Sequence, residues 1–255
     1  MVLTDTHTHL YYETDPLKRK ELIDRCLQNN VSRLFLPNVN TDSIAPVMEL
    51  TQAYPELCFP MLGLHPCDVK ENYIEELALI KQATAQHKIY AIGEIGIDLY
   101  WDKTTLESQK TAFRQQIAWA KELNLPIVIH CREAFDDVYE ILLDEKDEKL
   151  RGIFHCFAGT VEQARLIIEL NFYLGIGGVV TYKNSGLDKV VAEIDLKHLV
   201  LETDSPYLTP VPYRGKPNES SYLVYIAQKI ADLHHLPLEE VAEITTANSK
   251  MIFSA

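Results

Sequence analysis

Two histidines lie two residues apart near the start of the chain, His7 and His9 in DTHTHL. In an extended strand, residues two apart point the same way, so both imidazoles could bind one ion. An HxH pair also occurs by chance, and either histidine could be a hydrogen-bonded core residue. The pair alone therefore indicates half of a metal site at most.

More groups of this kind follow, each at or near the end of a short apolar run. They are His65 in GLHP, Glu94 and Asp98 in GEIGID, His130 in IHCR, His155 in FHCF, and Asp204 in ETDSP. Imidazole and carboxylate ligands suit Zn²⁺, Mn²⁺, Co²⁺ or Ni²⁺, and carboxylates also accept Mg²⁺. A ring of such groups predicts two divalent ions. Glu202 shares a strand face with Asp204, from which it could orient a ligand or a water.

The apolar runs themselves predict strands, and the segments between them have helical periodicity, as in Leu22, Ile23, Cys26 and Leu27. The predicted strands cover residues 1–9, 32–38, 58–65, 90–98, 126–131, 152–157, 172–178 and 199–204. Eight βα units in 255 residues predict an α/β protein with one domain, a (β/α)₈ TIM barrel over residues 1–255. A doubly wound open sheet is the alternative. In a barrel, active sites form at the C-terminal ends of the strands, where the histidines and carboxylates fall.

Composition limits the functional classes. No apolar run approaches the roughly 20 residues of a membrane span, and Asp5 lies where a signal peptide would be apolar. Five scattered cysteines without CxxC favour reduced thiols, so we expect a cytoplasmic protein without membrane contact or an obligate protein partner. The net charge of −13 argues against a protein that coats nucleic acid. A small or end-bound anionic substrate remains possible.

The motifs DTHTHL, GLHPCD, GEIGID, IHCR, FHCFAGT and ETDSPYLTPVPYRGKPNES occur in this order across the chain. Together they resemble the TatD family of metal-dependent deoxyribonucleases. The resemblance implies a barrel with two metals, His7, His9 and Asp204 at one, His130 and His155 at the other, and Glu94 bridging. The chain departs from the family pattern at Ala158, often serine there, and at Ser220, often proline, which puts substrate detail in doubt.

The predicted function is phosphodiester hydrolysis by a two-metal mechanism, with Asp204 as the general base and Glu94 between the ions. The resemblance further implies 3′–5′ deoxyribonuclease action on single-stranded DNA ends. A metal amidohydrolase that cleaves a small amide, lactone or ester is the alternative. Such enzymes often bridge their ions with a carboxylated lysine, and Glu94 occupies that place here.

Phosphate contacts are expected from the loops that follow the strands. The candidates are His65, Arg132, Arg214 and Lys216. His65 could instead hold the rim by a hydrogen bond, and Arg214 and Lys216 could pair with nearby acidic groups on the surface. Tyr100 and Trp101 could stack on a base or could pack beneath a loop.

Overall fold

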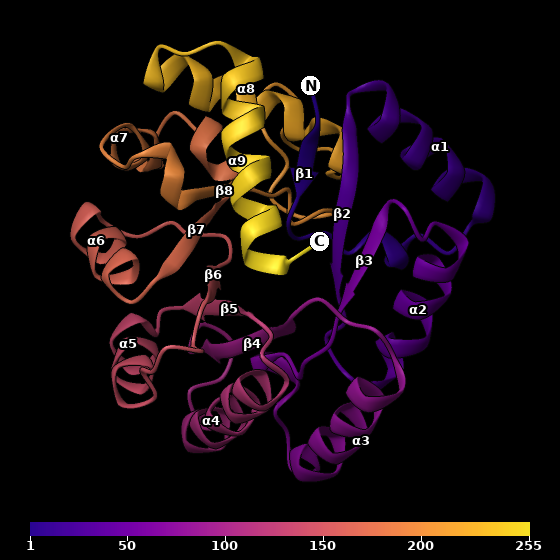
Figure 1. Cartoon of the computed structure of the whole chain (residues 1–255), viewed down its shortest axis with the longest axis vertical. Coiled ribbons are helices and arrows are strands. Elements are labelled where there is room, and N and C mark those ends of the chain that lie inside the picture. The colour runs from indigo at the N-terminus through magenta and orange to yellow at the C-terminus, as the bar shows by residue number, and fades with distance from the viewer.

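The computed structural model describes residues 1–255 as one ring of parallel strands surrounded by helices (Figure 1). The strands are β1 (Leu3–Asp5), β2 (Val31–Pro37), β3 (Cys58–Met61), β4 (Ile92–Asp98), β5 (Ile127–Arg132), β6 (Gly152–Phe154), β7 (Phe172–Ile176) and β8 (Leu199–Leu201). The helices are α1 (Pro16–Gln28), α2 (Ile44–Ala53), α3 (Tyr73–Gln86), α4 (Leu106–Leu123), α5 (Phe135–Asp144), α6 (Val161–Glu169), α7 (Leu187–Ala192), α8 (Leu223–His234) and α9 (Leu238–Phe253). Each predicted strand is present, although several are shorter than predicted.

Two seams close the ring between the sheets β1–β3 and β4–β8. At one seam, Leu62 bridges to Ile92, and the Gly93 amide donates to the Leu62 carbonyl at 3.0 Å. At the other, Thr8 bridges to Ser205, and the Thr6 amide donates to the Leu201 carbonyl at 3.0 Å. The closed (β/α)₈ barrel is therefore confirmed, and the open sheet is ruled out.

Local sequence signals set several helix ends. Pro16 opens α1, and the Asp15 side chain accepts the amides of Leu17 and Lys18. Thr160 and Gln163 form a capping box at the start of α6. These caps fix where each helix leaves its loop, and so how the loops above the barrel are held.

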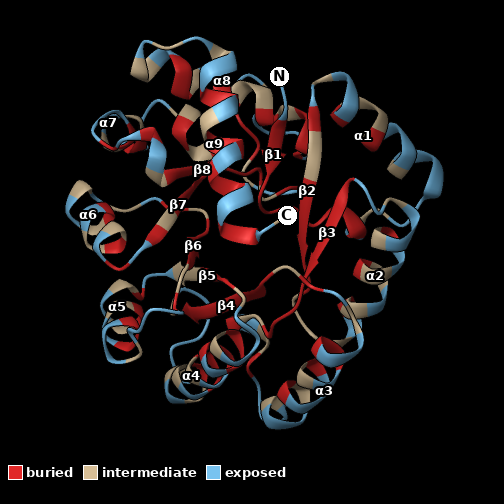
Figure 2. Cartoon of the chain, viewed as in Figure 1, coloured by how far each residue is buried: buried red, intermediate tan, exposed pale blue.

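The core has two layers. The larger apolar cluster fills the space between the strands and the helices, and the helices expose their outer faces (Figure 2). The smaller cluster lies inside the barrel: Phe35, Phe59, Met61, Ala91, Val128, Ile153, Val200, Ile252 and Phe253. Strands and α9 thus share one interior core.

Helix α9 covers the N-terminal end of the barrel. Asn248 donates to the carbonyls of Leu196 and Leu199 at 2.8 and 2.7 Å, at the start of β8. Farther along the helix, Phe253 stacks on Phe35 with ring centroids 3.9 Å apart. Site residues must therefore lie toward the other end. None of the helices combines the length and hydrophobicity that a membrane span needs.

Candidate metal centre

The strand period of two places the candidate ligands directly above the interior core. Val128 on β5 is followed two residues later by His130, and Ile153 on β6 by His155. The same spacing relates Val200 on β8 to Glu202 and then Asp204. Because residues two apart share a face, each of these positions continues the inward face of its strand. The C-terminal end of the interior is therefore polar.

Strand β4 reaches the same layer by an irregularity in its pairing. The register with β5 shifts between Ile92 and Ile95, and both isoleucines pack in the outer core. Ala91 and Glu94 therefore both face inward although they are three residues apart. Gly96 follows at φ +141°, where an added Cβ would lie only 2.0 Å from the His130 carbonyl oxygen. Regular alternation could not have predicted this bulge.

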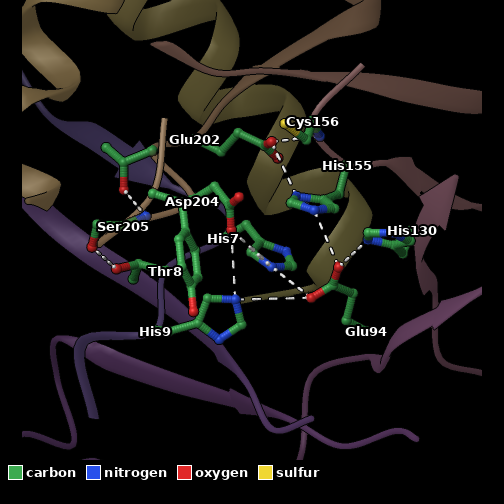
Figure 3. Close-up of polar contacts among 12 residues, drawn as sticks. His7, Thr8, His9, Glu94, His130, His155, Cys156, Glu202, Asp204 and Ser205 are labelled. Carbon is green, nitrogen blue, oxygen red and sulfur yellow. Dashed lines mark hydrogen bonds and ion pairs between the residues drawn. The ribbon is translucent and has the colours of Figure 1, made fainter. Parts of the chain in front are cut away.

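The Glu94 carboxylate lies at the middle of the site and is 2% exposed. Its Oε2 is 3.1 Å from His7 Nε2 and 3.8 Å from His9 Nε2. Its Oε1 is 2.8 Å from His130 Nδ1, 3.2 Å from His155 Nε2 and 3.3 Å from His65 Nε2. Figure 3 shows His7, His9, His130 and His155 converging on this carboxylate. Each oxygen therefore faces its own group of imidazoles.

Asp204 approaches the first of these groups from the opposite side (Figure 3). Its Oδ1 lies 3.5 Å from His9 Nε2 and 3.8 Å from His7 Nε2. Its backbone is left-handed, with φ 55°, and its amide donates to the His7 carbonyl at 2.9 Å. Asn218 holds the flanking loop, because its side-chain amide donates to the carbonyls of Thr203 and Tyr207 at 2.8 and 2.6 Å. This role of Asn218 has no signal in the sequence beyond its place in a tight loop.

Glu202 lies behind His155, away from Glu94. Its Oε1 is 3.1 Å from His155 Nδ1 and accepts the Cys156 amide at 2.5 Å. A Cβ on Gly175 would lie 2.2 Å from Glu202 Oε2, so only glycine leaves room for this carboxylate. The structure thus brings Glu202 to the position from which it can orient the ring of His155.

Asp98 has a similar relation to His130, which sequence reasoning missed. Its Oδ2 lies 2.8 Å from His130 Nε2. Its Oδ1 accepts the backbone amides of Tyr100 and Trp101 at 2.9 and 3.2 Å. The sequence places Asp98 at the rim, but only the structure shows that it joins a ligand candidate to the loop after β4.

The charges of this site are balanced by imidazole alone. No lysine or arginine lies within ion-pair distance of Glu94, Asp98, Glu202 or Asp204. Burial raises the pKa of Glu94, but His65, His155 and His7 outweigh burial and hold it well below the usual value. Burial likewise lowers the pKa of His155, but Glu202 and Glu94 raise it well above its usual range. Buried carboxylates without a fixed cation are costly unless a cation is bound.

These residues fit divalent metal ions. Three groups have ligand atoms within 4.8 Å of one another: His7, His9 and Glu94; His7, His155 and Asp204; and His65, Glu94 and His130. Nitrogen and carboxylate donors are the set that zinc and its neighbours prefer. The sequence places His65 at the rim with the other metal-competent groups but assigns it to a phosphate contact or a rim hydrogen bond. Its place beside Glu94 and His130 makes it a candidate ligand too.

A cavity of about 900 Å³ opens above the metal-binding residues. Its lining includes His65, Arg132 and Trp101 together with Glu94 and Asp204. Arg214 and Lys216 do not line it. The guanidinium of Arg214 instead lies over Tyr182 at 3.9 Å from the ring centroid, and Lys216 Nζ is 5.6 Å from the Tyr213 centroid. Phosphate binding by His65, Arg132, Arg214 and Lys216 stays a prediction.

Comparison with known proteins decides the family. Residues 4–254 match the family described as TatD related DNase. The chain belongs to the TatD family. It is 45% identical over 253 residues to the metal-dependent hydrolase YabD of Bacillus subtilis, covering 99% of both proteins. It is 31% identical over 258 residues to the metal-dependent hydrolase YcfH of Escherichia coli, covering 99% of this chain and 96% of YcfH.

Solved structures agree with this membership. The TatD homologue YjjV of Escherichia coli superimposes with a TM-score of 0.93 at 28% identity, covering 99% of this chain and 98% of that one. An amidohydrolase of Saccharomyces cerevisiae has the same fold, with a TM-score of 0.82 at 19% identity and coverage of 99% and 100%. The chain is therefore a TatD-family metal-dependent hydrolase with an amidohydrolase-like TIM barrel and clustered histidine and glutamate ligands.

Proposed function

We propose that this hydrolase is a deoxyribonuclease that removes nucleotides from the 3′ ends of single-stranded DNA with two divalent ions. One observation carries the proposal: the two oxygens of Glu94 face two different groups of imidazoles on the floor of a single cavity. A carboxylate in that position can bridge two ions. Paired ions suit in-line displacement at phosphorus, because both the attacking and leaving oxygens carry charge.

The proposed ligands are His7, His9 and Asp204 for one ion and His130 and His155 for the other, with Glu94 between them. When bound, the ions would supply Lewis-acid stabilisation of the charge that develops on the phosphoryl oxygens. Asp204 faces the cavity and would accept a proton from the attacking water. Glu202 would keep His155 Nδ1 protonated and its Nε2 free to bind an ion.

The charge of a nucleic-acid end also fits the proposed function. The chain has a net charge of −13, so an extended duplex would be repelled from most of its surface. Within the cavity the exposed guanidinium of Arg132 has no carboxylate within ion-pair distance, and bound ions would add positive charge. Local attraction of this kind suits a few phosphates at a strand end.

A substrate panel tests the proposal. Purified protein would be incubated with single-stranded DNA, RNA, a chromogenic phosphodiester and a chromogenic carboxylic ester, each with added Mg²⁺, Mn²⁺ or Zn²⁺ and with chelator. We expect metal-dependent release of nucleotides from the 3′ end of single-stranded DNA. Ester cleavage without phosphodiester cleavage would favour the amidohydrolase alternative. Activity that survives chelator would contradict both.

A further inference from the structure

Three neighbouring side chains, two of which line the cavity, are not explained by metal binding. Tyr100 and Trp101 are 50% and 70% exposed, so neither packs beneath a loop. The Arg132 guanidinium carbon lies 3.8 Å from the Tyr100 ring centroid and 5.7 Å from that of Trp101. We call Tyr100, Trp101 and Arg132 the rim platform. The chain's other tryptophan, Trp119, is only 6% exposed, so an open indole is not general in this protein.

The rim platform is held in a fixed relation to the metal-binding residues. Asp98 accepts the amides of Tyr100 and Trp101 through Oδ1 and contacts His130 through Oδ2. The two aromatic rings meet edge to face, with centroids 4.9 Å apart. Trp101 and Arg132 line the same cavity as Glu94, His155 and Asp204. One carboxylate thus sets both the aromatic pair and a candidate ligand.

An exposed indole beside an unpaired guanidinium has the chemistry of a nucleobase site. Aromatic faces stack on any base, and arginine contributes cation–π contact or hydrogen bonds to phosphate. A protein-binding patch would be expected on a convex surface, whereas these side chains edge a cavity that leads to the metal-binding residues. Their position favours a ligand that also reaches those residues.

We propose that the rim platform is a nucleobase subsite, in which Trp101 stacks on a base next to the phosphate that is cleaved. This inference rests on the proposed deoxyribonuclease function and adds a requirement to it. The substrate must carry a base at that position, but its identity matters little, because stacking tolerates every base. Arg132, held by Tyr100, supplies the positive charge beside the stacked base.

Kinetics with matched substrates test the subsite. The substrates are a single-stranded oligonucleotide and the same oligonucleotide with abasic residues at its 3′ end. Trp101→Leu keeps apolar volume and removes the flat ring, whereas Trp101→Phe keeps a ring. We expect Trp101→Leu to raise KM for the normal oligonucleotide about tenfold, within the range for losing one stacked base. For the abasic oligonucleotide, Trp101→Leu and the wild type should have the same KM. For the normal oligonucleotide, Trp101→Phe should have a KM between those of the wild type and Trp101→Leu.

Binding gives a second readout. In Trp119→Phe the sole remaining tryptophan is Trp101, so its fluorescence reports the subsite alone. With metal present and phosphorothioate linkages at the 3′ end to slow turnover, the normal oligonucleotide should quench this fluorescence more strongly than the abasic one that carries the same linkages. Leu17→Ala, which removes a 75% exposed side chain on α1, is the control for general surface effects and should leave KM unchanged.

The outcomes separate the two proposals. If the wild type degrades single-stranded DNA but Trp101→Leu keeps its KM, or loses equally on both oligonucleotides, the subsite is disproved and the deoxyribonuclease proposal stands. If the wild type degrades no nucleic acid with any metal, the deoxyribonuclease proposal fails and the subsite fails with it. Unchanged metal content in Trp101→Leu shows that the variant's effect does not come from a damaged metal centre.

Discussion

Val128 and His130 lie two residues apart on β5 and face the same interior, yet they belong to opposite ends of the barrel. Toward the N-terminal end, Val128 packs with Phe35, Ile153 and Phe253. Toward the C-terminal end, His130 contacts Glu94 and Asp98. The apolar end gains free energy from burial, whereas the polar end has a desolvation cost that the facing imidazoles offset and that bound cations would offset further. On β5, a residue that stabilises the barrel and a residue of the candidate site are therefore only two positions apart.

The largest expected effect is at the centre of the polar end. Glu94→Ala should remove a ligand from both ions, so bound metal should fall well below one ion per chain. His155→Ala should lose mainly one. Elemental analysis of the purified variants measures this directly. Equal losses of a single ion in both variants would contradict a bridging role for Glu94.

A matched change at the apolar end should act on stability instead. Phe253→Ala removes a ring that stacks on Phe35, and we expect the free energy of unfolding to fall by about 3 kcal/mol. Turnover of the folded enzyme should not change. Met251→Ala on the same helix, where the side chain is 64% exposed, is the control and should cost less than about 0.5 kcal/mol. Denaturant titration measures both, and loss of metal in Phe253→Ala would show that the two ends are not independent.

Asp204→Asn tests the proposed general base at the polar end of the barrel. The substitution keeps the shape of the side chain but removes its charge and basicity. With metal in excess, we expect turnover to fall by about a hundredfold or more, the range for loss of a general base. Steady-state kinetics on single-stranded DNA provide the measurement. If turnover survives, Asp204 does not accept the proton from the attacking water.

Glu202→Gln should have a smaller effect, because Glu202 acts on His155 and not on the substrate. The amide oxygen can still accept the Cys156 amide, so the fold should persist. Loss of the charge should weaken metal affinity by roughly 10- to 100-fold. Competition with a chromophoric chelator measures this affinity. Wild-type affinity in the variant would mean that Glu202 only fills space beside Gly175.

The smallest effect should come from Arg214, which lies over Tyr182 and outside the cavity lining. If its loop reaches the phosphate backbone, Arg214→Ala should raise KM for single-stranded DNA severalfold and weaken its salt dependence by about one phosphate contact. Metal content and KM for an uncharged ester should not change. An unaltered KM and salt slope would show that Arg214 does not bind the phosphate backbone and would limit the substrate-binding candidates to residues that line the cavity.

Much of this architecture could be predicted from the sequence, because strand alternation and helical spacing are local patterns. All eight strands and the ring of His7, His65, Glu94, His130, His155 and Asp204 follow from such patterns. The bulge between Ile92 and Ile95 could not be predicted, since it depends on pairing with β5. Two further contacts could not be predicted either: Asp98 meets His130, and Phe253 packs on Phe35. Each joins residues that are distant along the chain, and a single sequence does not show which distant residues meet.

The packed interior core and the α9 helix that covers its N-terminal end close the bottom of the cavity above the metal-binding residues. A polymer cannot thread through it, so anything that reaches the metal-binding residues must leave by the way it entered. Substrate therefore enters and product leaves through the same opening. The end of a nucleic-acid strand fits this geometry better than the middle of a long strand. In the proposed exonuclease reaction, each released nucleotide must therefore leave through the opening that the rest of the substrate occupies.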